Sequence, residues 1–135
     1  MERNWRSSQK PDRDRPIVLP FKGEIDLHVF PEITASLSAL IEKKPRHLVV
    51  DVSRVTYIDS AGLAALIVAM QKVEAYGGQF SLVGFQPTVH SIFKMSRLDR
   101  IFRIFPDVDT ALAHQASDNF ASTRGRLSFT VRSTV

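Results

Sequence analysis

Asp59 and Ser60 are the residues whose types and position most clearly suggest chemistry in this chain. They lie between Ile58, which ends a β-type segment, and the apolar residues 61–66. This spacing places the Ser60 hydroxyl at the start of a predicted helix, where unpaired backbone N–H groups and the helix dipole stabilise an anion. A phosphate on Ser60 would therefore lie where the backbone favours it. Capping of the helix by Asp59 or Ser60 is the alternative role, and the two roles are compatible.

The sequence around Ser60 does not match that of a catalytic serine. A nucleophile elbow has glycine two residues before and two residues after the serine, and Ile58 stands at the first of these positions. No glycine-rich phosphate loop followed by Lys-Ser or Lys-Thr occurs. The histidines are scattered without metal-binding spacing, at His28, His47, His90 and His114. The sequence therefore predicts no enzyme activity, no metal site and no cofactor.

Asp51 offers a second candidate phosphoacceptor because it ends a predicted buried strand, as in receiver domains. Glu24 and Asp26 could supply the acidic pair that binds magnesium in such domains. A receiver also needs a lysine after its fifth strand, and residues 101–106 contain none. We therefore expect Ser60, and not Asp51, to be the modified residue.

Composition and charge exclude several other classes of protein. The chain of 135 residues has no cysteine, which excludes a disulfide scaffold and thiol chemistry. Its net charge of +4 lies in the ends, because residues 17–116 carry ten basic and ten acidic side chains. A neutral central region does not predict a nucleic-acid groove. The longest apolar stretch, residues 63–70, is too short to span a bilayer and no signal-type segment is visible, so we expect a cytoplasmic protein without membrane insertion.

Strand and helix patterns alternate along the central region. Predicted strands cover residues 17–21, 48–52, 79–84 and 101–105, while predicted helices run from Pro31 to Lys44, over about residues 61–76, and onward from Pro87 and Asp107. Parallel strands need such crossover helices. The sequence thus predicts a single α/β domain with a mostly parallel or mixed sheet covered by about four helices. Pro20 suggests that its strand lies at an edge or contains a bulge, and we expect Phe93 and Met95 to be core residues.

The two ends of the chain are expected to differ from this central domain, which we place at residues 16–116. Residues 1–15 are polar and predict a flexible arm. Residues 117–135 form a polar, basic tail. In this tail Leu127, Phe129 and Val131 alternate with polar residues, which is typical of an added edge strand, and a disordered tail is the alternative.

Five short segments together carry a resemblance to a known family. They are Gly-Glu-Ile-Asp at 23–26, Leu-Val-Val-Asp-Val at 48–52, Tyr-Ile-Asp-Ser-Ala-Gly-Leu at 57–63, Gly-Gly at 77–78 and Phe-Lys-Met-Ser-Arg-Leu at 93–98. Over about residues 17–114 the chain resembles a STAS domain of the anti-sigma-factor antagonist family. The chain departs from many members in two respects. Many members have two strands ahead of the first segment, whereas residues 11–16 disfavour a long earlier strand here, and the long polar ends are the second departure.

The resemblance implies a switch protein that is not an enzyme. An unphosphorylated antagonist in this family binds an anti-sigma factor that is also a serine kinase, phosphorylation weakens the binding, and a phosphatase restores it. By position, the resemblance makes Ser60 the phosphoacceptor and implies a partner-binding surface made of Asp26, Asp59, Ser60, Ala61, Gly62 and Leu63. A weak homodimer is left open. The alternative function is that of a STAS interaction subunit that is not phosphorylated, for example in a lipid-transport ABC system.

Overall fold

A four-stranded parallel sheet forms the centre of the protein, in the strand order β1-β2-β3-β4. The computed structural model describes residues 15–114. In chain order the elements are β1 (Ile17–Ile25), α2 (Phe30–Ile41), β2 (His47–Ile58), α3 (Ser60–Ala75), β3 (Gln79–Val83), α4 (Pro87–Met95), the 3-10 turn η1 (Leu98–Arg100), β4 (Arg103–Phe105) and α5 (Val108–Ala113). The predicted α/β architecture with four helices is confirmed.

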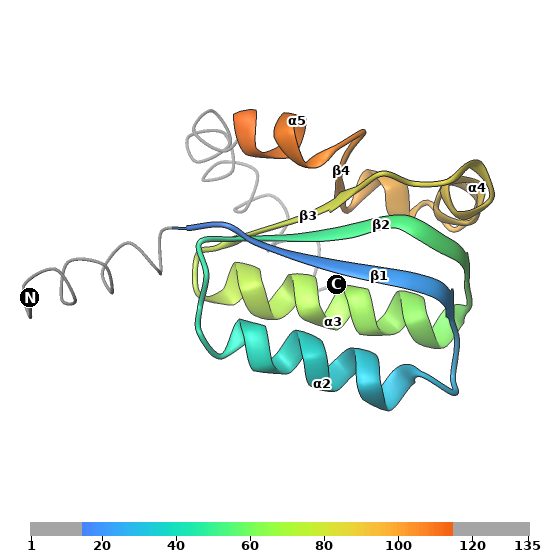
Figure 1. The fold of residues 1–135 in the computed structure, drawn as a ribbon, viewed down its shortest axis with the longest axis horizontal. Coiled ribbons are helices and arrows are strands. Elements are labelled where there is room, and N and C mark those ends of the chain that lie inside the picture. Colours follow the sequence, from blue (N-terminus) through green and yellow to red (C-terminus); the bar gives the residue numbers. More distant parts are fainter. Residues whose placement is uncertain (1–14, 115–135) are drawn as a thin grey trace, which may run out of the picture.

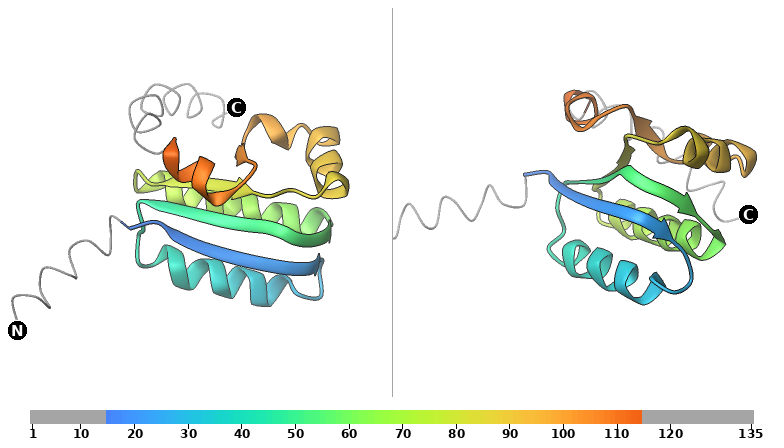
Figure 2. Two further views of the ribbon diagram at one scale, coloured as in Figure 1. Left: turned by 45° about the horizontal axis from the view of Figure 1, so that its top comes forward. Right: turned by 45° about the vertical axis from the view of Figure 1, so that its right-hand side comes forward.

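The helices lie on both sides of the sheet. Figures 1 and 2 show α2 and α3 side by side on one face of the sheet, with α5 on the opposite face. Helix α4 contributes Val89 and Phe93 to the core that also contains residues of α2 and α3. The sheet is covered in this way because every parallel connection must cross over one of its faces. All four strands point the same way, but β2 continues to Ile58, well beyond Asp51, which pairs with the last residue of β3. The loops after β1 and β2 therefore extend beyond the ends of β3 and β4.

The first half of β2 is buried on both of its faces, as the β-branched run at residues 48–52 predicts. Leu48 and Val50 belong to the main core, which includes residues of α2 and α3. Val49 instead packs with Val83 and Ala111 in a smaller cluster on the α5 side. Alternate residues of one strand thus hold the two helical layers to the sheet.

Residues whose types favour the start or the end of a helix lie at the helix ends. Asp59 is the N-cap of α3, and Asp107 is the N-cap of α5. Gly77 follows the end of α3 with φ of +89°, a left-handed conformation that glycine adopts without strain. Pro31 lies in the first turn of α2, where a missing N–H group costs nothing.

Several sequence-based boundaries need correction. Strand β2 runs to Ile58, so Asp51 lies inside the strand and not at its end. Strand β4 is limited to three residues because η1 occupies the chain just before it. Phe93 is buried as predicted, whereas Met95 at the end of α4 is 85% exposed, so its assignment to the core was wrong.

Pro20 has the position that its chemistry predicts. Strand β1 is an edge strand of the sheet formed by residues 15–114, and its register against β2 shifts between Pro20 and Lys22. A proline cannot donate a ladder hydrogen bond, so it is tolerated at an edge or an irregularity. The predicted arm, the tail and the candidate strand at residues 127–131 lie outside the described residues, apart from Arg15 at the end of the arm.

Candidate functional site

The candidate site lies at the edge of the sheet where β1 and β2 end. The two strands finish in register, with Ile25 paired to Ile58. Beyond this pair, the backbone N–H of Asp59 donates to the carbonyl oxygen of Ile25 at 3.1 Å. The parallel topology therefore brings together residues near 26 and residues near 60, which are more than thirty positions apart in the sequence.

The Asp59 carboxylate connects the two segments. Its Oδ1 accepts a hydrogen bond from the Gly62 backbone N–H at 3.0 Å, which caps α3. Its Oδ2 accepts from the Leu27 backbone N–H at 3.1 Å, which lies in the loop between β1 and α2. The capping role predicted for Asp59 is confirmed, and the second bond adds a tertiary link between the α3 N-terminus and this loop.

Asp26 forms a turn in the loop between β1 and α2. Its Oδ1 accepts from the backbone N–H groups of His28 at 3.0 Å and Val29 at 3.4 Å, an Asx turn that leads into α2. The exposed His28 ring lies beside this carboxylate, with 3.8 Å between Nδ1 and Oδ2. Asp26 is therefore a turn residue, and its side chain remains 29% exposed at the same edge of the sheet.

Ser60 is the first residue of α3 and is exposed. Its hydroxyl forms no hydrogen bond with any other residue between 15 and 114. The backbone N–H groups of Ser60 and Ala61 likewise have no acceptor in this part of the chain, because Asp59 takes the Gly62 amide. An accessible hydroxyl thus stands beside free donors at the positive end of a helix dipole.

Gly62 lies beneath this surface and not on it. It is buried, and a Cβ atom at this position would lie 2.7 Å from side-chain atoms of Ile25 and Ile58 and 2.9 Å from the Ile25 carbonyl oxygen. Only glycine allows the first turn of α3 to approach the strand ends this closely. Ala61 and Leu63 on either side are half-buried. Gly62 therefore supports the surface at Ser60 without forming part of it.

Sequence reasoning missed Leu27 as a member of this site. Its side chain is 68% exposed although it is apolar, and its backbone N–H is the second donor to Asp59. In the sequence Leu27 alternates with Ile25 and Val29 around two polar residues, which is typical of a continuing strand and gave no signal of an exposed turn residue. Tyr57, the penultimate residue of β2, is also 45% exposed and adds apolar surface where this strand ends.

Neither metal nor membrane chemistry is indicated for the described residues. Between residues 15 and 114 no group of three or more His, Cys, Asp or Glu side chains is arranged to hold a metal ion. The helices of this part of the chain are also too short or too polar to cross a bilayer. The pKa of Asp107 is lowered, because its carboxylate accepts a hydrogen bond from the Thr110 backbone N–H. Asp107 caps α5 and is not part of the site.

Comparison with known proteins agrees with this architecture. The STAS domain family model matches residues 7–111. The anti-sigma F factor antagonist of Paenibacillus polymyxa is 24% identical over 97 residues, which cover 71% of this chain and 83% of that protein.

Two solved structures also match. An anti-sigma factor antagonist from Mycobacterium paratuberculosis is 30% identical, with a TM-score of 0.70 over 78% of this chain and 89% of that one. Bacillus SpoIIAA in its phosphorylated form is 24% identical, with a TM-score of 0.58 over 76% of this chain and 91% of that one. With its parallel sheet, its four helices and a family match over most of its length, the chain belongs to the STAS domain family.

Proposed function

We propose that this chain is an anti-sigma factor antagonist in a partner-switching pathway. It binds an anti-sigma factor while Ser60 is unmodified, and phosphorylation of Ser60 releases it. The observation that carries the proposal is the exposed Ser60 hydroxyl at the N-terminus of α3, next to a carboxylate held by two hydrogen bonds. Relatives of this chain bear the name anti-sigma factor antagonist. The chain is a regulator in this account, and the chemistry on Ser60 belongs to its partners.

The effect of phosphorylation follows from charge and solvation. A phosphate adds about −1.5 to −2 charges at neutral pH, next to the carboxylates of Asp59 and Asp26. The free amides and the dipole of α3 stabilise this charge within the domain, so the fold is retained. A partner surface that fits a neutral serine meets added bulk, repulsion and a desolvation penalty. A loss of about 3 kcal/mol in binding free energy weakens association roughly a hundredfold.

The partner-binding surface in this proposal is centred on Ser60. Asp59 and Asp26 contribute the polar groups around it, and Ala61 and Leu63 contribute half-buried apolar surface. Gly62 permits the close approach of α3 beneath them. Residues 16–116 form the functional domain. Its partners are an anti-sigma factor with serine kinase activity and a phosphatase that removes the phosphate from Ser60.

A phosphorylation assay on the full chain tests this proposal. The chain is incubated with ATP and a serine-kinase anti-sigma factor from the same organism, and the modified residue is located by mass spectrometry. We expect one phosphate on Ser60, none in Ser60→Ala, and normal modification in Ser91→Ala, which removes an exposed serine from α4. A phosphate on another residue contradicts the proposal. A stable complex without any phosphorylation would instead support a constitutive STAS interaction subunit.

A further inference from the structure

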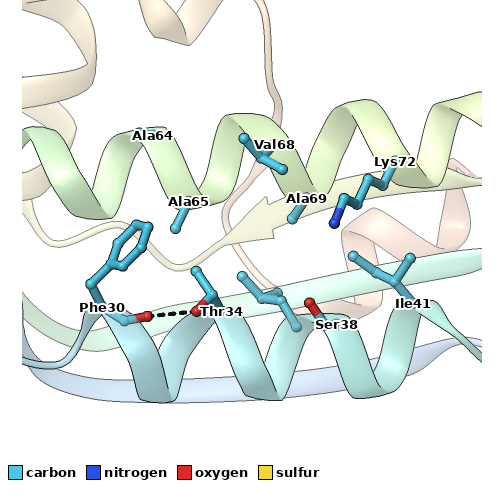
Figure 3. A pocket seen from close by; sticks show the side chains of 10 residues that line it. Phe30, Thr34, Ser38, Ile41, Ala64, Ala65, Val68, Ala69 and Lys72 are labelled. Atoms are coloured by element: carbon cyan, nitrogen blue, oxygen red, sulfur yellow. Dashed lines mark hydrogen bonds between the residues drawn. The ribbon is translucent and has the colours of Figure 1, made fainter.

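A groove between α2 and α3 begins at Ala64, one helical turn along α3 from Ser60, and runs toward the C-terminal end of that helix. Its volume is about 140 Å³, and Figure 3 shows the side chains that line it from both helices. Its α3 wall is built from small residues and a valine, namely Ala64, Ala65, Val68 and Ala69. Val68 remains 47% exposed although it is apolar. The groove is therefore an accessible apolar channel between two helices that otherwise pack together.

One end of the groove is largely apolar. Phe30, the first residue of α2, projects its ring toward α3 and closes this end in Figure 3. The next polar residue along α2 offers no free donor, because the Thr34 hydroxyl donates to the carbonyl oxygens of Phe30 at 2.9 Å and Pro31 at 3.1 Å. Thr34 thus presents mainly its methyl group. A ligand atom at this end would contact mainly carbon on the side of the protein.

The other end of the groove carries a cation and a hydroxyl. Lys72 of α3 directs its ammonium group toward α2, and Ser38 of α2 directs its hydroxyl toward α3, as Figure 3 shows. Neither side chain has an ion-pair or hydrogen-bond partner within residues 15–114. The positive charge and the hydroxyl hydrogen are therefore available to an acceptor that is not part of this domain.

We propose that this groove binds a medium-chain monocarboxylate, with its alkyl chain between the helices and its carboxylate at Lys72 and Ser38. An anionic head pairs with the ammonium group in a charge-assisted hydrogen bond, and the alkyl chain is removed from water against Val68 and Phe30. From Ala64 to Lys72 the helix rises about 12 Å, which suits a medium chain better than a long one. The narrow volume and the single cation at one end favour this ligand over a helix of another protein.

Calorimetric titration of the full chain tests the proposal with hexanoate, octanoate and decanoate below their micellar concentrations. Burial of each added methylene should tighten binding about fourfold. Lys72→Met should weaken octanoate binding about tenfold and leave the binding of neutral octanol unchanged. The matched control is Lys94→Met on α4, which does not line the groove and should bind octanoate as the unmodified chain does.

Two further variants distinguish binding of a carboxylate from occupation of the groove by another protein or a second copy of the chain. Val68→Asp places a charge in the channel at an exposed position, so it should abolish octanoate binding while the circular dichroism of the fold is retained. Ser60→Asp should bind octanoate normally, so this inference does not depend on the proposed switch. The proposal is overturned if octanoate does not bind, if Lys72→Met leaves its affinity unchanged, or if Val68→Asp instead abolishes self-association or protein-partner binding.

Discussion

Replacing Asp59 by alanine should destabilise the domain by more than the loss of a helix cap. The substitution removes the cap on Gly62, which is worth about 1 kcal/mol. It also removes the bond from the Leu27 amide, worth about another 1 kcal/mol. The expected decrease in the free energy of unfolding is therefore about 2 kcal/mol, or roughly a thirtyfold change in the unfolding equilibrium.

Urea denaturation and amide hydrogen exchange measure the two parts of this effect. Asp59→Asn should cost about 1 kcal/mol, because one amide oxygen replaces two carboxylate acceptors. Asp107→Ala is the matched control, since it removes an aspartate N-cap with a single backbone bond, from Thr110 at 2.7 Å. In Asp59→Ala alone, the Leu27 amide should exchange faster. The reasoning is refuted if Asp59→Ala costs no more than Asp107→Ala and leaves the exchange of Leu27 unchanged.

Three further substitutions and one pH titration test other parts of the account. Gly62→Ala should lower stability by about 1–3 kcal/mol in thermal unfolding, because its Cβ meets the Ile25 carbonyl oxygen and not only flexible side chains; an unchanged melting temperature would contradict the close approach. Met95→Ser should change stability by less than about 0.5 kcal/mol, whereas Phe93→Ala should cost about 3–5 kcal/mol, and equal effects would contradict their different burial. Because the pKa of Asp107 is lowered in the folded state, its contribution to stability is present above the ordinary aspartate pKa and is lost as the pH falls through the lowered value. NMR titration should place this midpoint below that of an unfolded aspartate, and a midpoint at or above it would contradict the cap.

The order of elements and their caps could be predicted because they depend on local sequence. Asp59 and Asp107 precede apolar segments at N-cap spacing, and Gly77 follows one, so each helix end is marked by nearby residues. Pro20 marks an edge for an equally local reason, the missing N–H group. Signals of this kind need no knowledge of which segments meet in the folded protein.

The link between Asp59 and Leu27 could not be predicted because it depends on tertiary contact. The two residues are 32 positions apart, and only the pairing of β1 with β2 brings the amide to the carboxylate. The exposure of Met95, by contrast, was missed although the geometry of a helix predicts it. It follows Phe93 by two residues, so the two side chains point in different directions on a helix, and Phe93 is the one that is buried.

The affinity of the anti-sigma factor for the two forms of this chain tests the central claim most directly. The dissociation constant is measured by calorimetry for the unmodified chain and for the chain phosphorylated on Ser60, with circular dichroism to show that both are folded. The account predicts binding weaker by about a hundredfold after phosphorylation, with the fold retained. Equal dissociation constants for the two folded forms would contradict it.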